Sequence, residues 1–161
     1  MKKGTLYLIP TFLSEDFTDI LPAEQMEIVR SLNEFVVEEP KTARHFLKKI
    51  NSKHPLAEIV LHTLNEHTDI KDVPGFLETA LNGKNIGLMS EAGCPAVADP
   101  GSLLVKYAHQ KGIRVKPLIG PSSILLALMA SGMNGQAFTF HGYLPREDRK
   151  SNTSELQSHS D

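Results

Sequence analysis

The sequence has little cysteine and no long apolar segment, and these two absences limit what the protein can be. Among 161 residues there is a single cysteine, Cys94, which excludes an internal disulfide framework and fits a reducing cytoplasm. No apolar run is long enough for a transmembrane helix. The short run near the N-terminus is interrupted by Pro10 and is too short for a signal peptide. We therefore expect a cytoplasmic protein that does not contact a membrane.

Strong net charge and the common nucleotide signatures are absent as well. The formal net charge is −2, so composition gives no sign of nucleic-acid binding, although a local basic face can exist on a neutral protein. The seven histidines show neither an HxxxH spacing nor a cysteine partner, and we expect no metal site. Neither GxGxxG nor a Walker A motif is present.

What is present is an alternation of strand-like and helix-like segments, which predicts an α/β fold with a parallel sheet and helices on both faces. Residues 57–69 mix β-branched residues with helix formers, and the pattern leaves their structure open. The predicted strands are 6–9, 35–40, 85–90, 113–118 and 137–145; the predicted helices are 23–34, 40–51, 70–83, 102–112 and 120–132.

Two domains are predicted. Residues 1–135 form the N-terminal α/β domain. Residues 136–161 hold the first strand of a second domain, followed by a polar, serine-rich tail that is typical of a disordered end.

Four loops leave the carboxyl ends of the predicted strands, where open α/β sheets bind ligands. They are residues 10–22, 39–42, 90–101 and 119–123. In the third, "SEAGCPAVADPG", glycines permit a ligand to approach the backbone closely. The other interpretation is a rigid connection in which Asp99 or Ser102 caps the next helix.

The remaining candidates also have two interpretations each. Ser122 and Ser123 follow a Gly-Pro turn, where they would either cap a helix or help to bind a polar ligand. Glu39 would act on a substrate hydroxyl or favour a helix start. Glu66 and His67 would move protons or simply lie on the surface.

Read in order, these segments resemble one family. "LYLIPTFLSE", "VVEEPKTARHFLKK", "LNEHT", "GLMSEAGCPAVADPG", "IGPSS" and "FTFHGYLPRE" are similar to the tetrapyrrole methylase superfamily, and most closely to its small-subunit rRNA methyltransferase branch. The likeness spans about residues 5–149. It implies a two-domain, homodimeric enzyme that binds S-adenosylmethionine between its domains and methylates a cytidine ribose 2′-hydroxyl in 16S rRNA of the small ribosomal subunit.

The resemblance also implies positions for the site. The cofactor contacts would be Ala92, Gly93, Cys94, Val97, Ser122 and Ser123. The candidates for a catalytic base are Glu39, Glu66, His67 and Glu91. A basic face for RNA would use Lys41, Arg44, Lys48 and Lys49.

Two departures from the family pattern bear on activity. The first loop reads "PTFLSE", with Phe12, Leu13 and Ser14 in place of small residues. The second domain, which would supply half of the cofactor cleft, is largely missing, so we expect weak cofactor binding and no turnover by this chain alone. The alternatives are a corrin or porphyrin C-methyltransferase and a non-catalytic binding or dimerisation domain.

Overall fold

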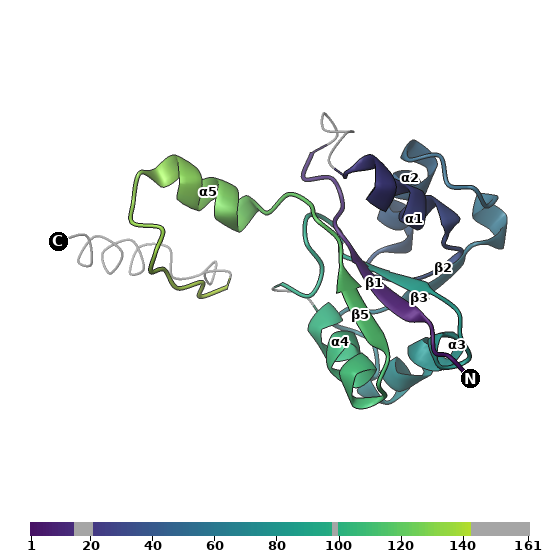
Figure 1. The fold of residues 1–161 in the computed structure, drawn as a ribbon. Helices are drawn as coiled ribbons and strands as arrows, with labels where there is room; N and C mark the ends of the chain where they lie inside the picture. The colour runs from purple at the N-terminus through teal and green to yellow at the C-terminus, as the bar shows by residue number, and fades with distance from the viewer. Residues whose placement is uncertain (15–20, 98–99, 143–161) are drawn as a thin grey trace. The chain divides into compact units, whose positions relative to one another are not determined.

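A five-stranded, all-parallel sheet organises the protein (Figure 1). The computed structural model describes residues 1–14, 21–97 and 100–142. The strand order is β3-β2-β4-β1-β5. This confirms the predicted α/β class with a parallel sheet. The strands are β1 (Thr5–Ile9), β2 (Glu34–Val37), β3 (Val60–Thr63), β4 (Ile86–Met89) and β5 (Arg114–Pro117).

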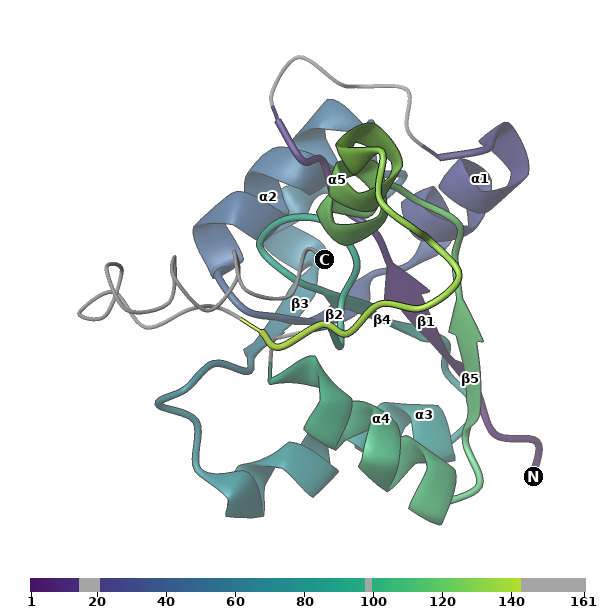
Figure 2. The same ribbon diagram turned by 90° about the vertical axis from the view of Figure 1, so that its left-hand side faces the viewer.

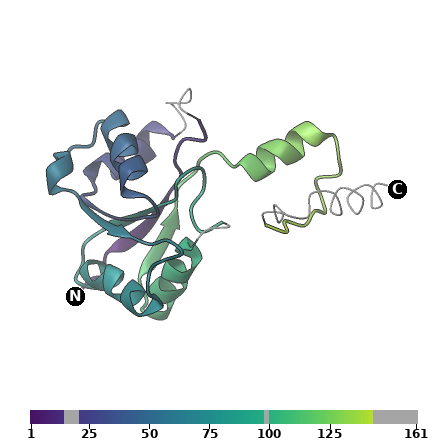
Figure 3. The ribbon, with the colours of Figure 1, turned by 180° about the vertical axis from the view of Figure 1, so that it is seen from behind.

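Helices cover both faces of this sheet, as the sequence predicts. The helices α1 and α2 pack on one face, and the segments that include α3 and α4 pack on the other (Figures 1 and 2). The same two layers are visible from behind (Figure 3). The α-helices are α1 (Ala23–Ser31), α2 (Pro40–Lys49), α3 (Glu78–Leu81), α4 (Gly101–Gln110) and α5 (Ser123–Ser131); 3₁₀ helices span Leu56–Glu58 and Ile70–Leu77.

The central strands are continuous apolar runs because both of their faces are covered. Every residue of β2 and of β4 is buried. Gly87 in β4 makes room for its neighbours, since a Cβ there would lie 2.6 Å from side-chain carbons of Ile9 and Phe35. A glycine at this position therefore lets the side chains of Ile9 and Phe35 pack directly over β4.

A buried carboxylate lies at the opposite, amino edge of the sheet. Glu34, at the start of β2, is 4% exposed. Its side chain contacts His62 Nε2 at 2.8 Å and Lys84 Nζ at 3.2 Å. Burial alone would raise the pKa of Glu34, but these partners outweigh burial and hold it below its usual range. His62 also stacks on Phe76, with ring centroids 5.2 Å apart.

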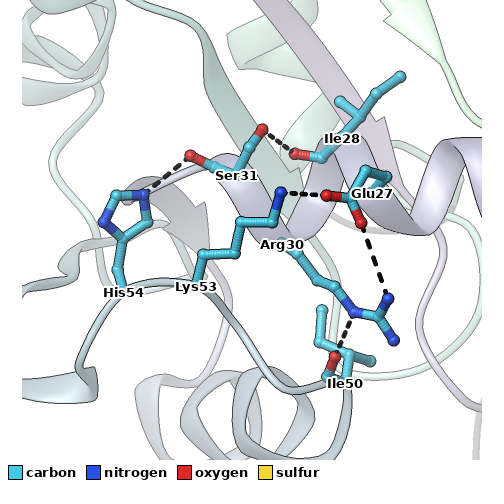
Figure 4. Close-up of polar contacts among 7 residues, drawn as sticks. All are labelled: Glu27, Ile28, Arg30, Ser31, Ile50, Lys53 and His54. Atoms are coloured by element: carbon cyan, nitrogen blue, oxygen red, sulfur yellow. Dashed lines mark hydrogen bonds and ion pairs between the residues drawn. The ribbon is translucent and has the colours of Figure 1, made fainter.

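Polar contacts fix the C-terminal end of α1 to the turn after α2 (Figure 4). Arg30 Nε donates to the carbonyl of Ile50 at 2.6 Å, and His54 Nε2 lies 2.9 Å from the carbonyl oxygen of Ser31. Glu27 pairs with Lys53 on the same surface. These contacts join the end of α1 to the segment that follows α2 in the same layer.

The structure assigns one segment that the sequence left open, and it differs from two predicted elements. The open segment 57–69 contains β3, an edge strand whose exposed positions weaken its apolar pattern. The helix predicted over 70–83 is a 3₁₀ helix followed by the short α3, because Pro74 lies inside it. Residues 137–142 form neither helix nor strand, since no described strand pairs with them; positions 143–145 of that predicted strand lie outside the described residues.

The chain forms two compact units, residues 1–127 and 128–161. The predicted division at residues 135 and 136 stays a prediction. The predicted disordered tail lies outside the described residues. Within the described ranges, no helix is both long and apolar enough to cross a membrane.

Candidate functional site

Connections reverse direction between β1 and β4, which are neighbours in the sheet. The helix that follows β1 packs on one face, whereas the helix that follows β4 packs on the other. The loops after these two strands therefore diverge at the carboxyl edge. In open α/β sheets such a reversal forms the crevice in which ligands bind.

Three loops at this edge are joined to one another. The amide of Thr11, after β1, donates to the carbonyl of Gly93, after β4, at 3.0 Å. The thiol of Cys94 donates to the carbonyl of Pro121, after β5, at 3.2 Å. Gly120 packs so closely on Pro10 that an added Cβ would lie 2.2 Å from its ring. The loops after β1, β4 and β5 are thus joined to one another by direct contacts. We call residues 10–14, 90–97 and 118–123 together the ledge.

The loop after β4 contains two residues with a left-handed backbone conformation. Gly93 has φ +73°, and a Cβ there would lie 3.1 Å from Leu13 Cδ2. Ala96, two residues past Cys94, also has a positive φ of +64°. Non-glycine residues in this region cost of order 1 kcal/mol and are found where a particular loop shape is needed. The shape of this loop is therefore held against its local preference.

The predicted cofactor contacts all lie along this ledge. Gly93 is buried, Cys94 is half-buried, and burial raises the pKa of its thiol. Val97 is 47% exposed, and Ala92 is also exposed. Their role in binding stays a prediction, because no ligand contact defines it.

The two serines of the following turn have separate roles in the fold. Ser122 Oγ accepts the amide of Leu125 at 3.5 Å, so Ser122 caps α5. Ser123 is exposed and is the first residue of that helix. At α4 the expected cap by Ser102 is wrong, because Pro100 occupies the cap position without a side-chain bond and Ser102 lies inside the helix. Asp99, the other expected cap, lies outside the described residues.

All four candidate catalytic side chains line one cavity of about 450 Å³ beyond β2, β3 and β4. Their roles stay untested, yet the fold brings together residues from three separate loops. We call this the acidic cavity. Its lining residues are Glu38, Glu39, Asn65, Glu66, His67, Glu91 and Pro100.

The environments of these candidates differ. The Glu39 carboxylate accepts the amide of Lys41 at 3.0 Å and so caps α2. His67 Nε2 lies 3.4 Å from Glu66 Oε1, but both side chains are more than 80% exposed. Solvent therefore screens their interaction. The amide of Glu91 donates to Glu38 Oε2 at 3.2 Å, which ties the loop after β4 to the end of β2.

A second cavity, of about 230 Å³, lies between the loop after β1 and α2. We call it the aromatic cavity. Phe12 and Phe46 pack with ring centroids 4.9 Å apart, and Lys49 Nζ lies 5.5 Å from the Phe12 centroid. Its lining residues are Thr11, Phe12, Leu13, Ser14, Thr42, His45, Phe46, Lys49, Glu91 and Ala92.

Thr11 is the residue of this region that the sequence does not single out. It is 4% exposed, and its hydroxyl has no hydrogen-bond partner among the described residues. A buried hydroxyl without a partner is costly, so its place in a native structure calls for an explanation. The β-bridge that buries Thr11 joins residues far apart in the chain, so no local pattern announces it.

The basic residues predicted for RNA all lie on α2. Lys41, Arg44 and Lys48 are exposed, with the three- and four-residue spacing that places side chains on one helix face. Lys49 is half-buried against Phe12. No group of His, Cys, Asp and Glu side chains in the described residues is suited to hold a metal ion.

Comparison with known proteins then identifies relatives. The chain is 35% identical over 142 residues to ribosomal RNA small subunit methyltransferase I of Xylella fastidiosa, and 32% identical over 157 residues to that of Bacillus subtilis. The Escherichia coli O157:H7 protein of the same name is 30% identical over 149 residues. These matches cover 88%, 96% and 91% of this chain.

The chain is a homologue of ribosomal RNA small subunit methyltransferase I. The predicted resemblance to this branch of the tetrapyrrole methylases is therefore confirmed. The chain spans about half the length of the curated relatives it matches, namely 50%, 50% and 49% for the three above. No family model matches it.

Proposed function

We propose that the chain is the N-terminal half of an S-adenosylmethionine-dependent methyltransferase that modifies the ribose 2′-hydroxyl of a cytidine in 16S rRNA. The observation that carries the proposal is the homology, over about nine-tenths of the chain, to proteins named ribosomal RNA small subunit methyltransferase I. The connected loops at the reversal of the sheet support it, because that is where a ligand of this fold class binds.

The residues present fit a cofactor held largely by backbone. The loop after β4 keeps Gly93 and Ala96 at positive φ, and its exposed stretch at Ala92 and Val97 leaves the chain open to a ligand. Ser122 and Ser123 would contact the cofactor from the turn after β5. S-adenosylmethionine would supply a methyl group on a sulfonium, which is transferred by in-line displacement. The ledge would hold the donor in line, and such alignment supplies a large part of the rate.

The acidic cavity is the proposed position of the acceptor ribose. A ribose hydroxyl has a high pKa, so a side chain that accepts its proton assists attack. Glu66, His67 and Glu91 are exposed at this cavity, and Glu39 also lines it while capping α2. The Lys41, Arg44 and Lys48 face of α2 would hold the RNA phosphates.

Calorimetric titration of S-adenosylmethionine and S-adenosylhomocysteine tests the cofactor part of the proposal. The chain is compared with a chimera that joins it to the unmatched half of the Bacillus subtilis relative, and with that intact relative. We expect weak binding by the chain and clearly tighter binding by the chimera. Absence of binding by a folded chimera, when the relative binds, would contradict a cofactor cleft built on this chain.

Methylation of small ribosomal subunits by the chimera tests the acceptor. Subunits are the expected substrate, because the relatives are named for ribosomal RNA. Transfer to a corrin or porphyrin instead would establish the alternative C-methyltransferase. If the chimera methylates neither substrate and associates with a partner or with itself without the cofactor, a non-catalytic binding or dimerisation domain is favoured. The proposal includes a cytoplasmic homodimer, which sedimentation of the purified chain and cell fractionation would check.

A further inference from the structure

The aromatic cavity has the properties of a binding site for a flat, polar-edged ring. Its lining is mainly apolar, and Phe12, Leu13 and Phe46 are among the lining residues. Its volume of about 230 Å³ leaves room for a single six-membered ring. Because Phe12 is half-exposed whereas Phe46 is 3% exposed, Phe12 offers the ring surface on which a ligand can stack.

Three of the lining residues, Thr11, Glu91 and Lys49, carry polar groups that can form hydrogen bonds. The buried hydroxyl of Thr11 lacks a partner among the described residues, and it can either donate or accept. Glu91 supplies a carboxylate, and Lys49 places its ammonium group over the Phe12 ring, 5.5 Å from the centroid, where the cation would also meet a ring stacked on Phe12. A carboxylate accepts from the exocyclic amine of cytosine, whereas uracil offers an oxygen at that position.

The two cavities share Glu91. A nucleotide whose base occupies the aromatic cavity would therefore place its sugar toward the acidic cavity, where the acceptor hydroxyl belongs. The exposed cations of α2 lie on the same helix as Phe46 and Lys49, so the phosphates on either side of that nucleotide would meet positive charge.

We propose that the aromatic cavity binds the unstacked base of the acceptor nucleotide, with Phe12 as its stacking platform and Glu91 as the residue that favours cytosine over uracil. A Glu91 carboxylate engaged with the base leaves Glu66 and His67 as the candidate bases for the ribose hydroxyl. This inference rests on the proposed function for the identity of the acceptor. It gives Phe12 a role at a position where the family resemblance implies a small residue. Single-stranded RNA is commonly recognised in this way, by aromatic stacking and contacts to base edges.

Fluorescence anisotropy with two labelled pentaribonucleotides, AACAA and AAUAA, tests the assignment on the purified chain. We expect AACAA to bind more tightly than AAUAA. Phe12→Leu keeps the apolar volume but removes the ring, and should weaken binding of both at least about five-fold. Phe12→Tyr should restore binding. Phe76→Leu, the same change at a half-buried phenylalanine that stacks on His62 and does not line the cavity, should have no effect.

Glu91→Gln tests the specificity separately. An amide accepts from cytosine and also donates to uracil, so the preference for AACAA should disappear while overall affinity changes little. Urea unfolding of each variant establishes that it is folded. In wild-type chain, cytidine monophosphate should shift the amide resonances of Thr11 and Ala92.

Several outcomes would overturn the assignment: no binding of either oligonucleotide, wild-type affinity in Phe12→Leu, or a cytosine preference that survives Glu91→Gln. If these occur while the chimera binds S-adenosylmethionine, only the base site is wrong. If the oligonucleotide results hold but the chimera binds no cofactor, the methyltransferase proposal fails and the cavity remains an RNA site.

Discussion

At the level of single residues, Glu34 is a carboxylate that is buried beside an otherwise apolar core. It is buried at the amino edge of the sheet, away from the carboxyl-edge loops, and is paired with His62 and Lys84. His62 and Lys84 both contact this one buried carboxylate, which indicates that Glu34 has a structural role. Removing the charge would leave the Lys84 ammonium without its anionic partner.

We predict that Glu34→Gln lowers the free energy of unfolding at pH 7 by about 2 kcal/mol. Because the pKa of Glu34 is lowered in the folded state, its contribution is present above its usual value of 4.5 and is lost as the pH falls through the folded-state pKa. The difference between wild type and variant should therefore shrink from pH 7 to pH 3. Urea unfolding at both pH values measures it.

Glu27→Gln is the matched control for this prediction. Glu27 pairs with Lys53 and Arg30, but its side chain is 53% exposed, so solvent screens the pairs. The control should change stability much less at pH 7. An equal loss in both variants would mean that burial gives Glu34 no special importance.

At the scale of secondary structure, α2 shows how one residue serves the fold and lies in the candidate site. Proline at its first position and Glu39 at its cap start the helix where the sequence predicts. The same Glu39 lines the acidic cavity. A carboxylate that accepts a helix amide is already engaged, so we assign Glu39 to capping rather than to catalysis.

We predict that Glu39→Ala destabilises the chain by about 1 kcal/mol through the loss of this cap, whereas Glu39→Asn keeps full stability because asparagine is a good cap. Thermal and urea unfolding of both variants provide the measurement. In the chimera, Glu39→Asn should retain cofactor-dependent methylation of ribosomal subunits. Loss of methylation in a stable Glu39→Asn chimera would show that the carboxylate itself takes part in the reaction.

At the scale of the whole molecule, the buried core belongs to the first compact unit. The two buried clusters run from Leu6 to Leu118, and α5 contributes no buried residue. The apolar residues of α5 are instead exposed, among them Leu125 at 52% and Met129 at 77%. Neither buried cluster therefore includes a residue of α5.

A chain that ends at Ser122 tests this directly. We predict that its free energy of unfolding by urea equals that of the 161-residue chain within about 0.5 kcal/mol, because no residue of either core cluster is removed. The m value of its urea unfolding should fall only slightly, because the removed segment adds little to the surface that unfolding exposes. A loss of several kcal/mol would show that α5 supports the core.

The fold class could be predicted from the sequence, because apolar runs that alternate with amphipathic segments are readable along the chain, as in β4 and α2. It did not resolve β3, whose edge position leaves residues such as Val60 exposed, nor the 3₁₀ geometry around Pro74. Local propensity competes with tertiary contacts at such positions, and the contacts decide the outcome.

The tertiary structure alone decided how the candidate site is assembled. The sequence singled out Glu39, Glu66, His67 and Glu91 one loop at a time, and the strand order brought them to one cavity. The pairing of Phe12 with Phe46, and the burial of Thr11 against Gly93, likewise join distant segments. Periodicity reports which face of an element is buried, whereas strand order depends on crossovers and long-range packing that no local pattern records.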